Sequence, residues 1–280
     1  MKAHYNKESL IDISDLLQDD VLKDVILSTW KEYTNFIEKP GLSFPNNIVF
    51  KFFDYKKNPE IKENAHVINL NNGNFEFLIE QLFVRDKSTL YHEFTHIMDM
   101  IMLHHPGDIK EFDKMYSTIT ETRSDYISYM YDSGLKSISD KTLISSNSII
   151  QSKHSSIGDC IQKESEKMTK YLSSLEPQNI CHNKKSLADV IFVQKQLQYY
   201  LGFCLFIKKH TNIPINNTIL LKATSIFGDK IYEIFEMCER IPLNMNDISE
   251  NDIDFAIKYS ALFKESYLYY WEQNKEFLKT

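Results

Sequence analysis

The spacing of hydrophobic residues predicts a mixed first part of the chain and a helical second part. Apolar residues recur at helical spacing over about 14–38, a segment that begins at a Ser-Asp cap and ends before a Pro-Gly pair. Segments 48–55 and 66–70 are short, β-branched and aromatic, and bounded by Asn, Pro or Gly, which is typical of strands. Segment 75–84 fits either a strand or a helix. A small sheet is therefore expected near the start of the chain.

Helical periodicity dominates the rest of the chain. It extends over about 87–104, where Pro106-Gly107 provides a stop, and over 109–131, before Gly134. The stretch 133–156 contains nine serines with little periodicity and predicts a loop or linker. Four further helices are expected, over about 157–175, 186–209, 217–240 and 247–278.

These elements predict an α+β fold, in which a small β-sheet and neighbouring helices precede a mainly α-helical C-terminal half. We expect a first domain over 1–135, a Ser-rich loop or linker over 136–156, and a helical subdomain over 157–280. No internal repeat or heptad array is visible in the sequence.

The charge balance argues against nucleic acid as a partner. The chain has 32 Lys and Arg against 39 Asp and Glu, a formal net charge of −7, whereas nucleic-acid-binding domains carry a basic surface. With 280 residues, 42% of them hydrophobic, the chain can bury a core without disulfide bonds.

The start of the chain and its apolar runs predict a soluble, cytoplasmic protein with no membrane segment. The first eight residues lack a charged segment followed by an apolar one, so we expect no secretory signal. The strongest apolar run, 197–207, is too short to cross a bilayer. Few Gly and Pro beside many Lys, Asn, Ile and Tyr suggest an AT-rich bacterial or phage genome. Four widely spaced cysteines are expected to be reduced and mostly buried: Cys160, Cys181, Cys204 and Cys238.

The segment His92-Glu93-Phe94-Thr95-His96 has the pattern H-E-x-x-H inside a predicted helix. Residues four apart lie on one helical face about one turn, ~6 Å, from each other, so both imidazoles can bind one ion through bonds of ~2 Å. Glu93 is rotated by about 100° from His92, where its carboxylate can take a proton from a zinc-bound water. The pattern predicts a zinc-dependent hydrolase. The alternative is two helix histidines satisfied by solvent or backbone.

A catalytic zinc site needs three protein ligands and one open position. Glu121 follows His96 by 25 positions on the next predicted helix, which a hairpin through Pro106-Gly107 would return antiparallel to the first. Glu121 would then complete the coordination. Asp125, one turn later, could accept a hydrogen bond from the second ring nitrogen of a ligand histidine. The alternative for both carboxylates is a solvated acidic face that pairs with nearby basic side chains.

The combined motifs resemble the gluzincin branch of the zincin metallopeptidases, in which H-E-x-x-H is followed on a second helix by E-x-x-x-D. The resemblance covers about 48–131 and implies His92, His96 and Glu121 as ligands of one Zn²⁺ per chain. It also implies Glu93 as general base and acid, Asp125 as support for a ligand, and the strand at 66–70 as an edge strand that pairs with extended substrate. The metzincin pattern fits less well, because it needs Gly and His where this chain has Asp99 and Met102.

A narrower resemblance is to phage and mobile-element peptidases that cleave an immunity repressor, which also place strands before an H-E-x-x-H helix. Their apolar, Pro-terminated stretch after the second helix is not visible in 126–132. We therefore expect a zinc metallopeptidase that acts on a peptide or protein substrate, with an undetermined oligomeric state. The alternatives are a non-catalytic zinc-containing regulatory or binding protein from a mobile element, and a zinc hydrolase of non-peptide amides.

Other polar residues near the motifs receive a weaker interpretation. Asp99 is expected to join a local network or an ion pair and not the metal. Tyr199 and Tyr200 are expected to pack in the core or between helices. Zincins also use a Tyr, His or Arg to stabilise an oxyanion, and the sequence does not rank the candidates His154, His182, Tyr126 and Tyr129.

Overall fold

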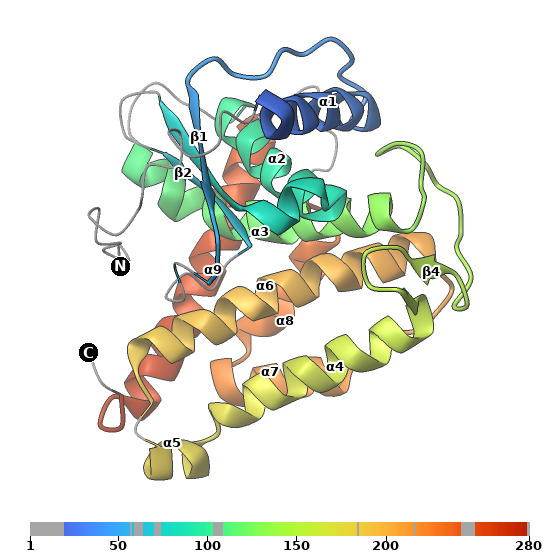
Figure 1. The fold of residues 1–280 in the computed structure, drawn as a ribbon. Coiled ribbons are helices and arrows are strands. Elements are labelled where there is room, and N and C mark those ends of the chain that lie inside the picture. The colour runs from blue at the N-terminus through green and yellow to red at the C-terminus, as the bar shows by residue number, and fades with distance from the viewer. Residues whose placement is uncertain are drawn as a thin grey trace.

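The computed structural model describes residues 20–56, 58, 64–69, 74–102, 109–183, 185–215, 217–241 and 250–278. A small sheet with two helices forms the upper part of the molecule in Figure 1, α3 crosses the middle, and the later helices pack below and behind it. This arrangement confirms the predicted α+β class. The first elements are α1 (Asp20–Phe36), β1 (Ile48–Phe53), β2 (Ala65–Asn69), β3 (Phe75–Glu80), the 3₁₀ helix η2 (Gln81–Arg85), α2 (Lys87–Met102) and α3 (Ile109–Asp132).

The sheet has the strand order β1-β3-β2. The central strand β3 runs parallel to β1, with Phe77 opposite Phe50, and antiparallel to β2, with Phe77 opposite Val67. Every residue of β3 is buried, as expected for a strand covered on both faces. Among the described residues, β2 pairs with β3 alone and therefore lies at an edge of the sheet.

An aromatic cluster fastens α1 and the sheet to α2. The Trp30 ring meets the Phe94 ring edge to face at 5.2 Å between centroids, and Tyr33 meets Tyr91 in the same way at 5.2 Å. Phe77 of β3 also contacts Phe94. Such ring contacts stabilise the fold beyond the contribution of the apolar area that they bury, and they favour particular ring orientations. The helix that carries the H-E-x-x-H pattern is thus fixed to the core by its own aromatic residues.

The later elements build the helical half of the molecule. The predicted loop at 133–156 contains two short strands of two residues each, which pair antiparallel. Ser156 and Ser186 are the N-caps of the helices that follow them, and their hydroxyls accept hydrogen bonds from the backbone N–H groups of Asp159 and Asp189. These elements are β4 (Ile149–Ile150), β5 (Ser155–Ser156), α4 (Ile157–Ser174), α5 (Pro177–Asn183), α6 (Leu187–His210), α7 (Thr218–Phe227), α8 (Lys230–Cys238) and α9 (Glu250–Asn274).

Several predicted boundaries require correction. The single helix expected over 217–240 is wrong, because Gly228 has φ +82° and divides it into α7 and α8. The prediction also missed α5. Segment 75–84, left open between strand and helix, is β3 followed by η2. The expected starts of the first helix and of the helix at 247–278 lie partly outside the described residues.

Helix α6 contains the apolar run 197–207. In length and composition alone it could cross a membrane, but 61% of its most apolar window is buried inside the protein. Core helices share both properties, so this is weak evidence for a membrane. Burial of three cysteines, Cys160, Cys204 and Cys238, confirms that part of the prediction, while the side chain of Cys181 lies outside the described part.

Candidate metal centre

The helix that carries the motif begins where the sequence predicts. Asp86 accepts hydrogen bonds from the Ser88 backbone N–H at 3.1 Å and the Thr89 hydroxyl at 2.7 Å. A carboxylate in this position satisfies donors that the first turn of a helix leaves unpaired. Helix α2 therefore starts at Lys87, and the motif lies from its second turn onward.

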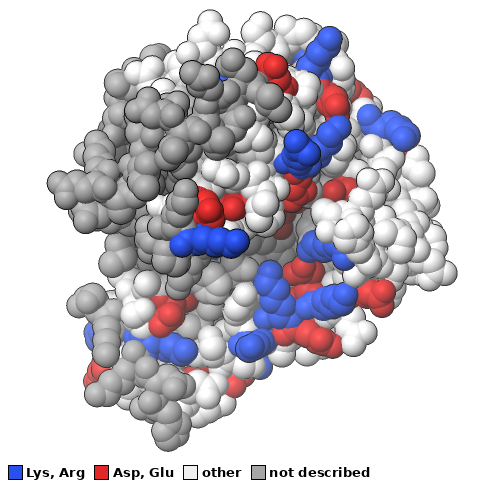
Figure 2. Space-filling view, viewed as in Figure 1, with Lys and Arg blue, Asp and Glu red and all other residues white. Residues whose placement is uncertain are grey.

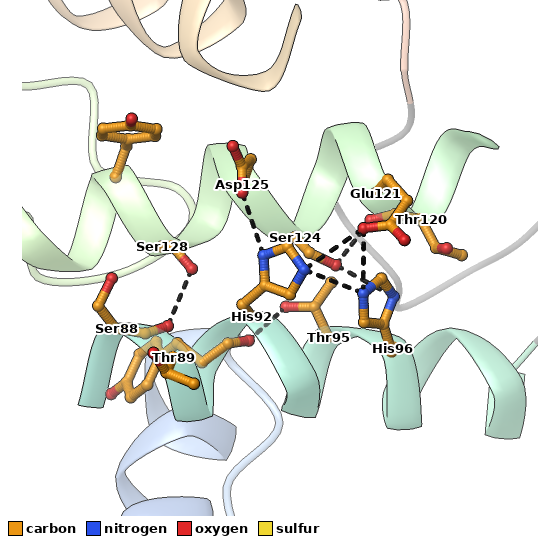
Figure 3. Close-up of polar contacts among 12 residues, drawn as sticks. Ser88, Thr89, His92, Thr95, His96, Thr120, Glu121, Ser124, Asp125 and Ser128 are labelled. Carbon is orange, nitrogen blue, oxygen red and sulfur yellow. Dashed lines mark hydrogen bonds and ion pairs between the residues drawn. The ribbon is translucent and has the colours of Figure 1, made fainter. Parts of the chain in front are cut away.

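The two residues at the x positions of H-E-x-x-H, Phe94 and Thr95, face the core. Phe94 is fully buried, and Thr95 is 1% exposed. The Tyr33 hydroxyl lies 3.1 Å from Thr95 Oγ1, which in turn donates to the Tyr91 carbonyl at 2.8 Å. Because these residues anchor one face of α2, His92 and His96 on another face point towards α3 (Figure 3).

Helices α2 and α3 run antiparallel, as the sequence predicted. Ser128 donates to the Ser88 carbonyl at 3.0 Å, Asp125 lies opposite His92, and Glu121 lies opposite His96 (Figure 3). Residue numbers therefore fall along α3 as they rise along α2. This pairing brings side chains 25 positions apart into one cluster.

Three donor atoms converge in this cluster. His92 Nε2 and His96 Nε2 are 3.1 Å apart, and Glu121 Oε2 lies 3.5 Å from each. Zinc bonds of ~2.0–2.1 Å at tetrahedral angles place donor atoms ~3.3–3.4 Å apart. The observed triangle therefore has the dimensions of one face of a tetrahedral site, and His92, His96 and Glu121 form a group that could hold a metal ion.

Hydrogen bonds to the other ring nitrogens orient both histidines. Asp125 Oδ1 lies 3.1 Å from His92 Nδ1, the contact expected from the sequence. Ser124 Oγ lies 3.3 Å from His96 Nδ1 and donates its own proton to the Thr120 carbonyl at 2.6 Å. The Ser124 oxygen is therefore an acceptor for His96 Nδ1–H. In both rings the Nε2 lone pair is the one available to a metal in the neutral form.

Glu121 Oε2 is buried and has no hydrogen-bond partner in the described part of the protein. The distances of 3.5 Å to the two histidines are longer than a good hydrogen bond. Buried carboxylate oxygens are normally satisfied by donors or by a metal. This orphaned oxygen, together with two imidazoles, fits a divalent cation.

The charges of the cluster also favour a cation. Burial would lower the pKa of His92, but the neighbouring carboxylates of Asp125, Glu121 and Glu93 raise it to about 10. Burial opposes ionisation of Glu121, yet the neighbouring His96, His92 and Lys195 hold the pKa of that carboxyl well below its usual range. The metal-free cluster thus retains a proton on His92 among negative groups, and a metal ion would take its place.

Asp99 is not part of this cluster. Its carboxylate is fully buried and pairs with Arg123, at 2.6 Å to the terminal nitrogen and 3.3 Å to Nε. The pair joins α2 to α3 one turn beyond His96. Asp99 therefore forms an ion pair, as expected from the sequence.

Glu93 is 7% exposed and follows His92 directly. Its negative charge is close enough to contribute to the raised pKa of His92. Within the described residues, no hydrogen bond or ion pair engages the Glu93 carboxylate. Glu93 is thus a buried carboxylate next in sequence to one of the three candidate ligands.

The sequence analysis missed two residues of α6 at this site. Lys195 Nζ lies 3.3 Å from Glu121 Oε1. The Tyr199 ring of α6 stands at 70° to the His92 ring of α2, 5.8 Å between centroids, so Tyr199 packs between helices, and Tyr200 is buried in the core. Burial, with the nearby charge of Glu121, raises the pKa of Tyr199 well above its usual value and keeps its hydroxyl protonated.

The structure places three of the suggested oxyanion donors elsewhere. Tyr126 bonds to His210 Nε2 at 2.8 Å in the core, and Tyr129 is engaged by Lys153 and Glu164. His154 is exposed in the loop before β5. The side chain of His182 lies outside the described residues.

The described side chains on one face of the molecule give no further indication of a partner. On the face in Figure 2, the described basic and acidic side chains are intermixed, and neither sign covers a large area. No protein-family model matches the chain, and no curated protein or solved structure matches it either. The resemblance to zincin peptidases therefore rests on the motifs and on the geometry of the cluster.

Proposed function

We propose that this protein is a zinc-dependent metallopeptidase. The observation that carries the proposal is the triangle formed by His92 Nε2, His96 Nε2 and Glu121 Oε2. Two imidazoles and one carboxylate are a donor set of catalytic zinc sites, which keep a fourth position open. The three side chains are each 13–16% exposed, so water can reach the group.

Glu93 is the proposed general base and acid. When bound, the metal would act as a Lewis acid on the substrate carbonyl and lower the pKa of a water molecule. Glu93 would accept the proton of that water and deliver it to the leaving amine. A purely structural metal site has no need of a buried carboxylate in this position, and Glu93 has no described structural partner.

The position of β2 supports a peptide as the substrate. Among the described residues it is an edge strand that packs beside α2, and it is antiparallel to β3, which leads through η2 into the motif helix. An edge strand offers unpaired backbone N–H and C=O groups to an extended chain. A peptide paired along β2 would have its backbone held next to the helix that carries His92.

The substitution Glu93→Gln tests this function. We expect the variant to keep one zinc per chain and the same thermal unfolding, because the amide is isosteric, and to lose peptide hydrolysis by about 10²–10⁴-fold. Cleavage would be followed by mass spectrometry on a mixed peptide library. His92→Ala, as the matched control, should lose both zinc and cleavage.

The outcomes separate the proposed activity from its rivals. A Glu93→Gln protein that cleaves peptides at the wild-type rate would exclude Glu93 as the base. A wild-type protein that binds zinc but cleaves no library peptide would favour a regulatory zinc protein or a hydrolase of non-peptide amides.

A further inference from the structure

Glu121 presents its two carboxylate oxygens to different partners. Oε2 faces His92 and His96, whereas Oε1 lies 3.3 Å from the Lys195 ammonium of α6. The Lys195 ammonium is also 5.6 Å from the centre of the Tyr199 ring, and that ring contacts His92. A cation from a third helix therefore holds the oxygen that does not face the histidines.

The position of Lys195 is set by close packing of α6 on α3. Gly202 lies on the same face of α6, one turn after Tyr199 and two turns after Lys195. A Cβ atom at Gly202 would lie 2.4 Å from the Thr122 carbonyl oxygen and 2.7 Å from Asp125 Cβ. Such short distances leave no room for a side chain, so α6 is fixed against the segment of α3 that carries Glu121.

A carboxylate can bind a metal through one oxygen or through both. If both oxygens of Glu121 turned towards an ion, the second oxygen would occupy a coordination position, and an ion that also held a water molecule would have five ligands in place of four. The ammonium group 3.3 Å from Oε1 opposes this rotation, because the rotation would separate the two opposite charges. The contact therefore selects single-oxygen coordination.

We propose that Lys195 is a positioning residue that holds Glu121 as a one-oxygen ligand and so keeps a coordination position open for water or substrate. This inference rests on the proposed metal site and assigns it a component from the helical half of the chain. The Lys195 side chain is 31% exposed, and ion pairs of such exposure add little to stability. Its replacement should therefore alter the metal site without unfolding the protein.

Co²⁺ in place of zinc reports the coordination number directly, because four-coordinate Co²⁺ absorbs visible light more strongly than five- or six-coordinate Co²⁺. Purified metal-free protein would be titrated with Co²⁺ for the wild type, Lys195→Met, Lys195→Arg and Lys208→Met. Lys208 lies on the same helix and pairs with Glu239 on the surface, so it is a matched control. Thermal unfolding would verify that each variant is folded.

We expect all four proteins to bind one Co²⁺. The visible absorption of Lys195→Met should fall about twofold or more, as Glu121 becomes a two-oxygen ligand, and Lys195→Arg and Lys208→Met should keep the wild-type spectrum. A Lys195→Met spectrum identical to that of the wild type would overturn the role of Lys195 and leave the metal site intact. Absence of Co²⁺ binding to the wild type would instead refute the metal site itself.

Discussion

At the scale of single residues, the candidate site depends on side chains that support the ligands. Asp125 and Ser124 each engage the Nδ1 atom of one histidine and leave its Nε2 atom directed to the centre. The sequence indicated Asp125, because it is one helical turn from Glu121, but not Ser124. A serine has many uses in a helix, and only the hydrogen bond from Ser124 to the Thr120 carbonyl in the structure identifies the Ser124 oxygen as an acceptor.

Removal of either support should weaken metal binding. Asp125→Asn and Ser124→Ala should each lower zinc affinity by about 10–100-fold, the usual effect of a lost partner of a metal-bound histidine. Competition with a chromophoric chelator measures this change. Ser128→Ala is the control, because Ser128 is on the same helix and bonds to the Ser88 carbonyl outside the site. Equal affinities in all four proteins would contradict the assigned role.

Metal binding should depend on pH through His92. The pKa of His92 is raised to about 10, so at neutral pH the metal-free protein carries a proton there that zinc must displace. Apparent affinity should therefore rise with pH, by about tenfold per unit for one displaced proton, and fall as the solution is acidified. Calorimetry in buffers of different ionisation enthalpy counts the released proton. A zinc affinity that does not change between pH 6.5 and 8 would contradict this prediction.

At the scale of elements, α3 is the helix around which the site is assembled. One face of α3 presents Glu121, Ser124 and Asp125 to α2. The α3 backbone at Thr122 packs closely against α6 at Gly202. The sequence predicted the pairing of α2 with α3, because a hairpin through Pro106-Gly107 would return the second helix antiparallel to the first and a catalytic zinc site needs a third ligand. It could not predict the contact with α6, because the crossing of two helices depends on packing between residues far apart in the chain.

A single methyl group at the crossing of α3 and α6 should be destabilising. Gly202→Ala is expected to reduce the free energy of unfolding by about 1–3 kcal/mol, because the new atom would overlap the Thr122 carbonyl. Gly158→Ala in α4 meets its nearest atom at 3.5 Å and should be neutral or stabilising by up to about 1 kcal/mol. Denaturant unfolding of both variants tests the difference. Equal free energies of unfolding for the two variants would show that α6 and α3 are not closely packed at Gly202.

At the scale of the whole molecule, one continuous hydrophobic core extends from α1 to the C-terminal helices. The predicted division into sections at 1–135, 136–156 and 157–280 stays a prediction, although α3 of the first section packs against α6 and α9 of the last. The fold class followed from hydrophobic periodicity. The break at Gly228 was missed because a glycine inside a helical pattern can either continue or end a helix.

Because the candidate ligands come from two helices, a bound metal should stabilise the fold. A ligand that binds only the native state adds about 4 kcal/mol at a free concentration 1,000 times its Kd. Zinc should therefore raise the melting temperature of the wild type, and a chelator should reverse the increase. The His92→Ala protein should respond to neither. A melting temperature of the wild type that zinc does not change would argue against a site that bridges α2 and α3.

The most direct test of the central claim is the zinc content of the purified protein, measured by elemental analysis after purification without chelator. The wild type, His92→Ala and Glu121→Ala would be prepared in parallel. We predict one zinc per chain in the wild type, none in His92→Ala, and a reduced content in Glu121→Ala. Absence of zinc from the wild type, with none taken up on addition, would contradict the account and leave H-E-x-x-H as a coincidence of helix sequence.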